Sequence, residues 1–388
     1  MTGLDRNAEA SNMIEPQFTL GLEEEYLLVD RTTRDLASAP PAELFSDCEA
    51  ALEGRVSPEF LKCQIEVGTP VCTSLDDARQ ELRFLRRTIA EKARPYGLAP
   101  IAASTHPFAE WMRQPHTDKE RYNDIAKAMQ VVADRLLICG MHVHVGIEDE
   151  ELRIDLFNQL AYFLPHLLAL STSSPFWRGR NTGLKSYRMA VFNELPRTGL
   201  PEAFESYSDY QRTINVLIKA GVIEDGTKIW WDLRPSARFP TLEMRITDLC
   251  TKLEDAIAIA ALFRCLCRML YRLRRSNMRW RTYSRFLIAE NRWLAERHGT
   301  GAELIDYGRG TLMPYSDLIE EMIDLVQEDI AFFGCEAEIG RIRKIVAEGT
   351  SADRQISLYE TSIAKGSSTD EALKDVVDQL IAETVEDC

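Results

Sequence analysis

Gly21-Leu-Glu-Glu-Glu-Tyr-Leu-Leu-Val29 carries two glutamates, Glu23 and Glu25, two positions apart in a segment that ends in apolar residues. In a β-strand, residues i and i+2 point to the same face, so these carboxylates face one point while Leu22 and Glu24 face the other side. Like charges held this close cost free energy unless a cation compensates them. The pair predicts half of a divalent-metal site suited to Mg²⁺ or Mn²⁺, although a solvated strand edge would give the same pattern.

The composition limits the classes of partner. The chain has 388 residues, of which 45% are hydrophobic, and its formal net charge is −15. That charge argues against nucleic acid and anionic membranes as partners. The nine cysteines follow no repeating spacing, which indicates reduced thiols and a cytoplasmic protein. Residues 1–15 are polar and predict a disordered leader, and residues 16–388 predict a single catalytic domain.

The distribution of apolar residues predicts an α+β fold with an antiparallel sheet. Strand patterns occur at residues 18–29, 61–71, 98–104, 139–147, 227–233 and 241–246. Helical patterns separate several of them, including one over residues 117–138, and a long loop is expected over residues 171–199. From residue 252 onward the sequence predicts only helices. We therefore expect a sheet-containing core over residues 16–250 and an all-helical part over residues 251–388 packed on it.

The common nucleotide-binding and hydrolase motifs are absent from the sequence. There is no G-x-x-x-x-G-K-[ST] phosphate loop, no G-x-G-x-x-G after a strand and no G-x-S-x-G elbow. No C-x-x-C pair is present, which makes a structural zinc site a poor fit. If a nucleotide binds, it must therefore be held by metals and arginines.

The strand patterns carry a set of oxygen and imidazole ligands: Glu23, Glu25, Glu59, Glu66, His142 and Glu243. Such a set suits two or three hard cations better than zinc. His142 shares a strand face with His144, and a histidine packed in the core would give the same His-x-His pattern. A zinc amidohydrolase would need further histidines, and only His166 and His298 follow, both in helical patterns.

Three arginines, Arg234, Arg238 and Arg245, bracket Glu243. Guanidinium groups beside a metal-ligand glutamate are suited to stabilise a phosphoryl group during its transfer. Surface ion pairing is the alternative interpretation of these arginines. Together with the carboxylates, they favour binding of a triphosphate through metal ions.

Six sequence blocks, in this order, resemble the glutamate–cysteine ligase type 2 family, also called YbdK-like carboxylate–amine ligases. The blocks are residues 21–26 (GLEEEY), 64–70 (QIEVGTP), 140–146 (GMHVHVG), 174–183 (SPFWRGRNTG), 186–188 (SYR) and 242–248 (LEMRITD). The family is similar to glutamine synthetase and the guanidino kinases in its catalytic sheet. The resemblance implies a curved, mainly antiparallel sheet that forms a funnel, with ATP at one end.

The resemblance also implies roles for individual residues. The cation on the nucleotide phosphates would be held by Glu23, His142 and Glu243, and the cation on the acceptor side by Glu25, Glu59 and Glu66. The catalytic contacts to the γ-phosphate and the acyl phosphate would come from Arg234 and Arg245. Further contacts to ATP would come from Arg234, Arg238 and His144. The substrate α-carboxylate would be bound by Arg180 and Arg188, with Trp177 and Tyr187 as walls of the pocket.

The reaction implied by the resemblance is ATP-dependent amide synthesis with Mg²⁺ or Mn²⁺. The γ-carboxylate of L-glutamate would form an acyl phosphate, and L-cysteine would attack it to give γ-glutamylcysteine. The motifs leave the amine open, and the family favours a homo-oligomer, with a dimer first. Two alternatives are a guanidino-type phosphotransferase and a non-enzymatic nucleotide-binding regulator.

Overall fold

The computed structural model describes residues 15–388. The predicted disordered leader, residues 1–15, lies outside the described residues except for Glu15. The Glu15 carboxylate accepts a hydrogen bond from Arg268 at 2.8 Å, and so joins the folded part of the chain.

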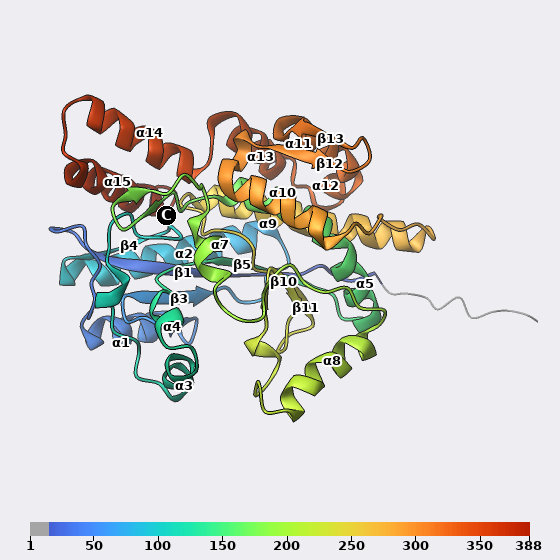
Figure 1. Cartoon of the computed structure of the whole chain (residues 1–388), viewed down its shortest axis with the longest axis horizontal. Coiled ribbons are helices and arrows are strands. Elements are labelled where there is room, and N and C mark those ends of the chain that lie inside the picture. Colours follow the sequence, from blue (N-terminus) through green and yellow to red (C-terminus); the bar gives the residue numbers. More distant parts are fainter. Residues whose placement is uncertain (1–14) are drawn as a thin grey trace, which may run out of the picture.

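A seven-stranded antiparallel sheet forms the centre of the molecule (Figure 1). The strand order is β10-β11-β5-β1-β3-β2, and β4 lies beside the last part of β1. The bounds are β1 Leu20–Asp30, β2 Val56–Pro58, β3 Gln64–Gly68, β4 Leu98–Ile101, β5 Met141–Gly146, β10 Leu233–Pro235 and β11 Thr241–Met244. The expectation of an α+β fold built on an antiparallel sheet is confirmed.

Strand β1 alternates between two environments along its first half. Leu20, Leu22 and Glu24 are buried, whereas Glu23 and Glu25 are only half-buried. This period of two is what the pleat of a strand imposes, because successive side chains point to opposite faces. The prediction that Glu23 and Glu25 share a face, opposite Leu22 and Glu24, is confirmed.

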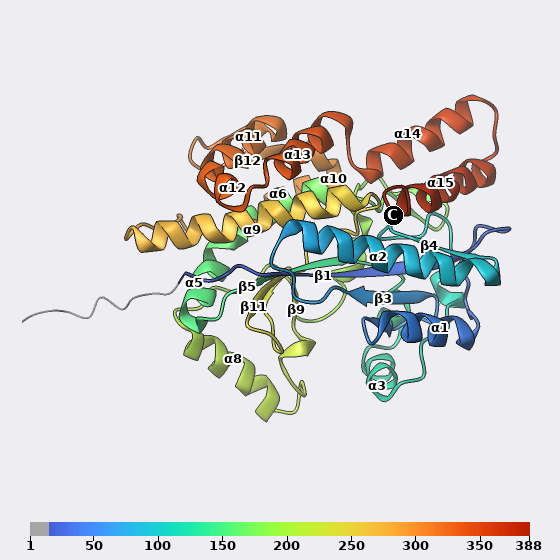
Figure 2. The ribbon, with the colours of Figure 1, turned by 180° about the vertical axis from the view of Figure 1, so that it is seen from behind.

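Helices cover the buried face of the sheet. Helix α2 (Leu75–Ala93) begins with a capping box, in which Ser74 and Asp77 exchange hydrogen bonds. Helix α9 (Leu253–Arg275) is buried on all sides from residue 253 to residue 271, apart from the half-buried Glu254 near its start, as its apolar sequence predicts. The two helices contact each other, and they contact β1 and β5 respectively; Figure 2 shows both on the same side of the sheet.

Helices separate several of the strands and dominate the chain after residue 252, as the sequence patterns predict. The helices not yet given are α1 Ala42–Leu52, α3 Glu120–Met129, α4 Val131–Asp134, α5 Glu150–Leu160, α6 Leu164–Ser171, α7 Tyr187–Phe192, α8 Tyr207–Lys219, α10 Arg285–His298, α11 Tyr315–Leu325, α12 Gln327–Phe333, α13 Glu336–Glu348, α14 Ser351–Ala364 and α15 Thr369–Thr384. The single helix expected over residues 117–138 is wrong. It is split at Gln130, whose backbone has a φ of 50° and cannot continue an α-helix.

Three other regions differ from the expectations. The loop at residues 171–199 contains the hairpin β6 Phe176–Trp177 and β7 Arg180–Asn181, followed by α7 and by β8 Thr198–Gly199. The strand expected at residues 227–233 is replaced by a short 3-10 turn at Gly226–Lys228 and the two-residue strand β9 Trp230–Trp231. The C-terminal part is not all-helical, because β12 Glu303–Asp306 and β13 Thr311–Pro314 form a hairpin. Its turn is fixed by Asp306, whose carboxylate accepts hydrogen bonds from two main-chain amides.

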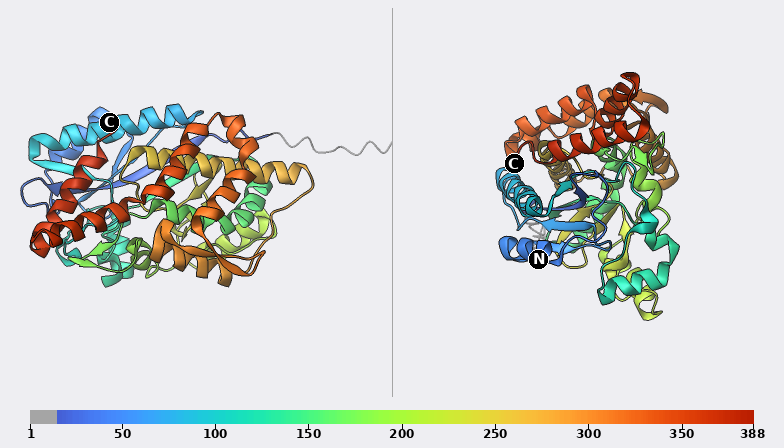
Figure 3. Two further views of the ribbon diagram at one scale, coloured as in Figure 1. Left: turned by 90° about the horizontal axis from the view of Figure 1, so that it is seen from above. Right: turned by 90° about the vertical axis from the view of Figure 1, so that its left-hand side faces the viewer.

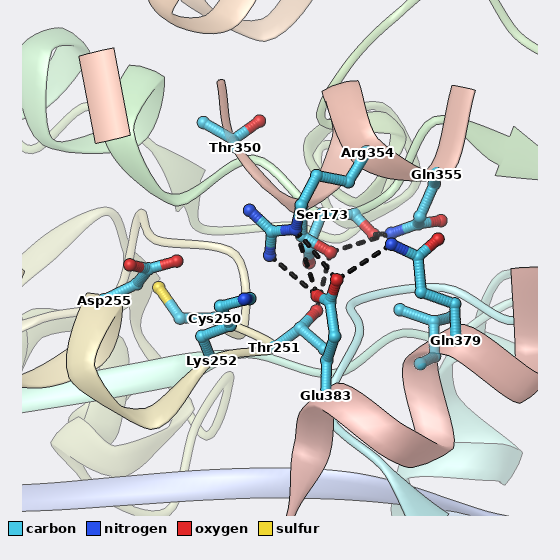
Figure 4. A network of polar contacts seen from close by, with 12 residues as sticks. Ser173, Cys250, Thr251, Lys252, Asp255, Thr350, Arg354, Gln355, Gln379 and Glu383 are labelled. Carbon is cyan, nitrogen blue, oxygen red and sulfur yellow. Dashed lines mark hydrogen bonds and ion pairs between the residues drawn. The ribbon is translucent and has the colours of Figure 1, made fainter. Parts of the chain in front are cut away.

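The last two helices are fastened to the core by side-chain hydrogen bonds (Figure 4). Arg354 of α14 binds Glu383 of α15 through two nitrogens, at 3.0 and 2.8 Å, and Gln355 donates to the carbonyl of Ser173 at 2.8 Å. Helix α15 contacts α14 and β4, and the right-hand view of Figure 3 shows these two red helices above the blue strands of the sheet. Within residues 15–388, no helix has the length and apolar character needed to cross a membrane.

Candidate functional site

The half-buried face of the sheet forms the floor of a cleft with a volume of about 710 Å³. One wall comes from the segment that contains α3 and α4. The opposite wall comes from the β10–β11 hairpin and from residues 227–230. Residues 188–195 close the space between them.

Strand register brings the predicted ligands together on this floor. Glu23 pairs with His142 on one side and with Gly68 on the other, and Glu25 pairs with Glu66. Side chains of residues that pair across antiparallel strands share a face, so these acids point into the cleft together. The six predicted ligands, Glu23, Glu25, Glu59, Glu66, His142 and Glu243, all line the cleft.

Within the described residues, three groups of ligand atoms lie within 4.8 Å of one another: Glu25, Glu59 and Glu66; Glu23, Glu66 and His142; and Glu23, His144 and Glu243. The first group is the one expected on the acceptor side. The third group differs from the expectation, because Glu243 meets His144 and not His142. The cause is the register of β5 and β11, which places Glu243 directly opposite His144.

His144 is oriented as a metal ligand would be. Its Nδ1 lies 2.9 Å from the Thr241 hydroxyl, which fixes the ring. Its Nε2 lies 3.5 Å from a Glu23 oxygen and is buried without a hydrogen-bond partner among the described residues. A ring held by one nitrogen, with the other aimed at carboxylates, is the usual arrangement of a metal-binding histidine. The residues present therefore fit a cation at this point.

The carboxylates on the floor repel one another. Burial raises the pKa of Glu66 well above its usual range, and the neighbouring Glu59, Glu23 and Glu25 raise it further. Burial also favours the neutral form of Glu23, but the imidazoles of His142 and His144 outweigh this and hold the pKa of Glu23 below its usual range. Oxygen-rich sites of this kind suit Mg²⁺ or Mn²⁺, which would replace the repulsion by attraction.

Two of the three predicted arginines lie inside the cleft and close to Glu243. Arg234 binds both oxygens of Glu243, at 2.8 and 3.1 Å, and Arg245 also binds Glu243. Burial raises the pKa of Glu243, but Arg245 and Arg234 more than reverse this and lower it. Both side chains are only 11–12% exposed, so surface ion pairing does not describe them. Arg238 is exposed at the mouth of the cleft.

Arg188 is a buried guanidinium without an ion-pair partner in the described part of the chain. It is 2% exposed, and its terminal nitrogens contact the carbonyls of Arg245 and Ile246 at 3.2 and 3.4 Å. Its Nε has no partner there, and its charge lies 5.2 Å from the ring centre of Phe192. A Cβ at Gly140 would come within 2.5 Å of this guanidinium, which explains the glycine. A buried positive charge facing a cleft is suited to bind a carboxylate.

Three predicted substrate-binding residues do not reach the cleft. Arg180 is exposed on β7, and Trp177 and Tyr187 pack on each other with ring centres 5.4 Å apart. For Trp177 and Arg180 the reason is the tight β6–β7 turn, where Arg178 and Gly179 both have positive φ and the chain reverses direction. The structure gives no support for these three positions in substrate binding.

Several cleft residues were not foreseen. They are apolar side chains of the wall formed by α3 and α4, together with Trp230 and Phe239 on the opposite side. An apolar helix face normally predicts packing against the core, so no signal in the sequence marked these residues as part of a cavity.

Comparison with known proteins gives one family. The model of glutamate–cysteine ligase family 2 matches residues 19–379. A protein of Rhodospirillum rubrum named "Putative glutamate--cysteine ligase 2" is 61% identical over 377 residues, which cover 96% of this chain and 97% of that protein. A protein of the same name from Jannaschia sp. is 55% identical over 372 residues, covering 96% of this chain and 98% of its own length.

Solved structures share the fold at low sequence identity. The glutamate–cysteine ligase of Francisella tularensis, in complex with AMP, has a TM-score of 0.68 and 14% identity, covering 95% of this chain and 89% of that one. The bifunctional glutathione synthetase of Pasteurella multocida also has a TM-score of 0.68, with 15% identity. The match covers 95% of this chain but 53% of that larger protein, so the chain spans about half of its length.

Proposed function

We propose the reaction of this chain from one premise: it belongs to glutamate–cysteine ligase family 2 and is an ATP-dependent carboxylate–amine ligase. In the proposed reaction it joins the γ-carboxylate of L-glutamate to an amine through an acyl phosphate. The resemblance carried by the six sequence blocks is thereby confirmed. L-cysteine, which would give γ-glutamylcysteine, is the first acceptor to test. The proposal is supported by one observation above all: a cluster of carboxylates and imidazoles lies beside buried arginines in a single cleft.

The residues on the floor would hold divalent cations. One cation fits Glu25, Glu59 and Glu66, and another fits Glu23 with His144 and Glu243. When bound, such cations neutralise a triphosphate and polarise its terminal phosphoryl group.

The arginines provide the remaining charge. Arg234 and Arg245 are fixed by Glu243, which holds their positive charges toward a phosphoryl group at this end of the cleft. The Nη1 of Arg234 donates to the carbonyls of Thr227 and Ile229, whereas the Nε of Arg245 has no hydrogen-bond partner among the described residues. Arg188 lies next to Arg245 and to Gly140, whose amide donates to Glu25 at 2.8 Å. It is therefore placed between the phosphate-binding arginines and the acid cluster, where a substrate carboxylate would be activated.

The proposed chemistry balances in two steps. A carboxylate oxygen forms a bond to the γ-phosphorus of ATP and the bond to the β-phosphate oxygen breaks, which gives an acyl phosphate and ADP. The amine nitrogen then bonds to the acyl carbon, and the carbon–oxygen bond to phosphate breaks. Of the two protons that the ammonium loses, one stays on the phosphate and one passes to solvent.

A matrix assay tests the proposal. Phosphate release from MgATP would be measured with L-glutamate alone, with each amine alone and with both, and products identified by mass. We expect release that needs both partners and an amide product. Transfer of phosphate to a guanidino compound would instead indicate the phosphotransferase alternative. Nucleotide binding without any turnover would indicate the regulator. Glu320→Gln, which changes an exposed ion pair with Arg343, is the control for surface substitutions.

A further inference from the structure

The two ends of the cleft differ in chemistry. At the β10–β11 end the lining includes Arg234, Arg238 and Arg245. At the other end, beyond Glu25, Glu59 and Glu66, the wall consists largely of apolar side chains: Phe60, Tyr122, Ile125, Met129, Leu136 and Ile138. A polyphosphate would bind beside the arginines, so the apolar end is available to bind the other substrates.

The apolar wall is held in place next to the acid cluster. The ring of Tyr122 meets Phe60 edge to face at 6.0 Å, and its hydroxyl donates to the carbonyl of Pro58 at 2.7 Å. Gln64 of β3 donates to the carbonyl of Ile138 at 2.7 Å, which ties that residue to the sheet. A wall fixed at several points keeps its shape and can select between acceptors.

Cationic groups at this end are few. Among the described lining residues near the wall, Arg55 is paired with Glu81 at 2.8 Å, and Lys119 is exposed. The buried guanidinium of Arg188 also lines the cleft, but in the proposed function it pairs with the carboxylate substrate and is not open to the acceptor. An acceptor with its own carboxylate would therefore place that charge against apolar side chains, which costs free energy.

We propose that the preferred acceptor is a primary amine that carries a branched aliphatic or aromatic group and no carboxylate. The inference rests on the proposed function and names the acceptor class of the same site. The apolar group packs between Met129 and Phe60, and the amino group points to the acyl carbon beside Arg188. Bond changes and proton release are those of the second step given above.

Competition between matched amines tests this preference. With MgATP and L-glutamate saturating, isoamylamine and phenethylamine would be compared with ethylamine, L-phenylalanine and L-cysteine, with amide formation followed by mass. We expect kcat/KM for the two apolar amines to exceed that for each of the other three at least about 10-fold, because each buried apolar group adds discrimination. L-cysteine as the best acceptor would overturn the inference and leave the ligase intact.

Substitutions in the apolar wall test whether this wall causes the preference for apolar amines. Met129→Glu should raise KM for isoamylamine about 10-fold or more and leave KM for ATP and L-glutamate unchanged. Val131→Glu is the matched control, since Val131 is 62% exposed on α4 and does not line the cleft. Met129→Gln gives a milder change if the charged variant folds poorly. An equal effect of Met129→Gln on all amines would overturn the inference. Failure of every amine tested to give an amide would remove the proposed function as well.

Discussion

The two faces of β1 place glutamates in opposite environments. On the buried face, Glu24 is fully buried and binds Arg86 through both oxygens, at 2.8 and 2.6 Å, and it also accepts a hydrogen bond from Tyr26. On the cleft face, Glu23 and Glu25 meet other carboxylates and imidazoles. Glu24 therefore has a guanidinium as its counter-charge within the chain. Glu23 has only the imidazoles of His142 and His144, and Glu25 lies among other carboxylates, so both would gain a full counter-charge from a bound cation.

This contrast separates structural from functional acids. A buried carboxylate with a complete set of partners stabilises one arrangement of the chain, although it adds little net free energy. Carboxylates that crowd one another, as those around Glu66 do, cost free energy in the empty protein, and such clusters are typical of functional sites. The pairing of the charge, and not its burial alone, distinguishes the two.

The largest effect is expected on the buried face. Arg86→Ala leaves Glu24 buried without its partner, so the free energy of unfolding should fall by about 3–5 kcal/mol. Denaturation by urea, followed by circular dichroism, measures this loss. The double variant Glu24→Leu/Arg86→Met removes both charges and should recover most of it. A loss below about 1 kcal/mol for Arg86→Ala would show that the pair is not what distinguishes this face.

On the cleft face the main effect should be on activity. Glu23→Gln removes one ligand charge, so ATP turnover should fall at least about 100-fold. Its unfolding free energy without metal should fall, but by less than that of Arg86→Ala, because the His142 and His144 imidazoles hold the Glu23 pKa below its usual range and so stabilise its charged form. Mg²⁺ should raise the melting temperature of the parent protein and not of the variant. Full turnover in Glu23→Gln would argue against a cation at this position.

Arg188 tests the unpaired cation that faces these acids. Arg188→Ala should raise KM for the carboxylate substrate about 10-fold or more, and more than KM for ATP, because a charged hydrogen bond to substrate is lost. Steady-state kinetics with each substrate varied in turn measures both constants. Arg180→Ala, on the exposed β7 strand, should change neither. Equal KM values for the carboxylate substrate in the parent and in Arg188→Ala would show that another residue binds this carboxylate.

Glu296 provides an intermediate case, because Arg292 is shared between it and Asp232. Burial, only partly offset by Arg292, raises the pKa of Glu296 to about 7. The folded state therefore binds this proton more tightly than the unfolded state. The stability contribution is complete below the unfolded pKa of about 4.3 and is lost as the pH rises through 7.

Between these pH values, the unfolding free energy of the parent should decline by on the order of 1 kcal/mol per pH unit relative to Glu296→Gln. Urea titrations at pH 5, 6 and 7 would give the two slopes. Parallel pH dependences would mean that Glu296 keeps an ordinary pKa and that Arg292 satisfies both acids.

The comparison also shows what the sequence could predict. Alternation in β1, β3 and β5 was enough to place Glu23, Glu25, Glu66 and His142 on one face, because a strand has a fixed period. The pairing of Glu243 with His144 depends on the register of β5 and β11, and a slip of two residues would place His142 opposite Glu243 instead.

Other features depend on contacts that local patterns do not record. Arg86 and Glu24 are 62 positions apart in the sequence, and no pattern in either segment predicts that they pair. The loop that carries Arg180 and Trp177 was rich in turn residues, but the direction of its hairpin is set by Arg178 and Gly179. The apolar wall of the cleft has the same helical pattern as a buried helix face, so its exposure to a cavity could not be foreseen.

The position of β1 between three other strands has a consequence for synthesis of the protein. It is made early, yet its partners β3, β4 and β5 follow later, and Glu243 arrives later still. Arg86, which matches Glu24, also donates to the carbonyls of Thr251 and Thr384, the second in the last helix. While the chain is still on the ribosome, β1 therefore lacks the strands and helices that pack around its glutamates in the folded protein. We expect chaperones that bind nascent chains to protect this segment until translation is almost complete.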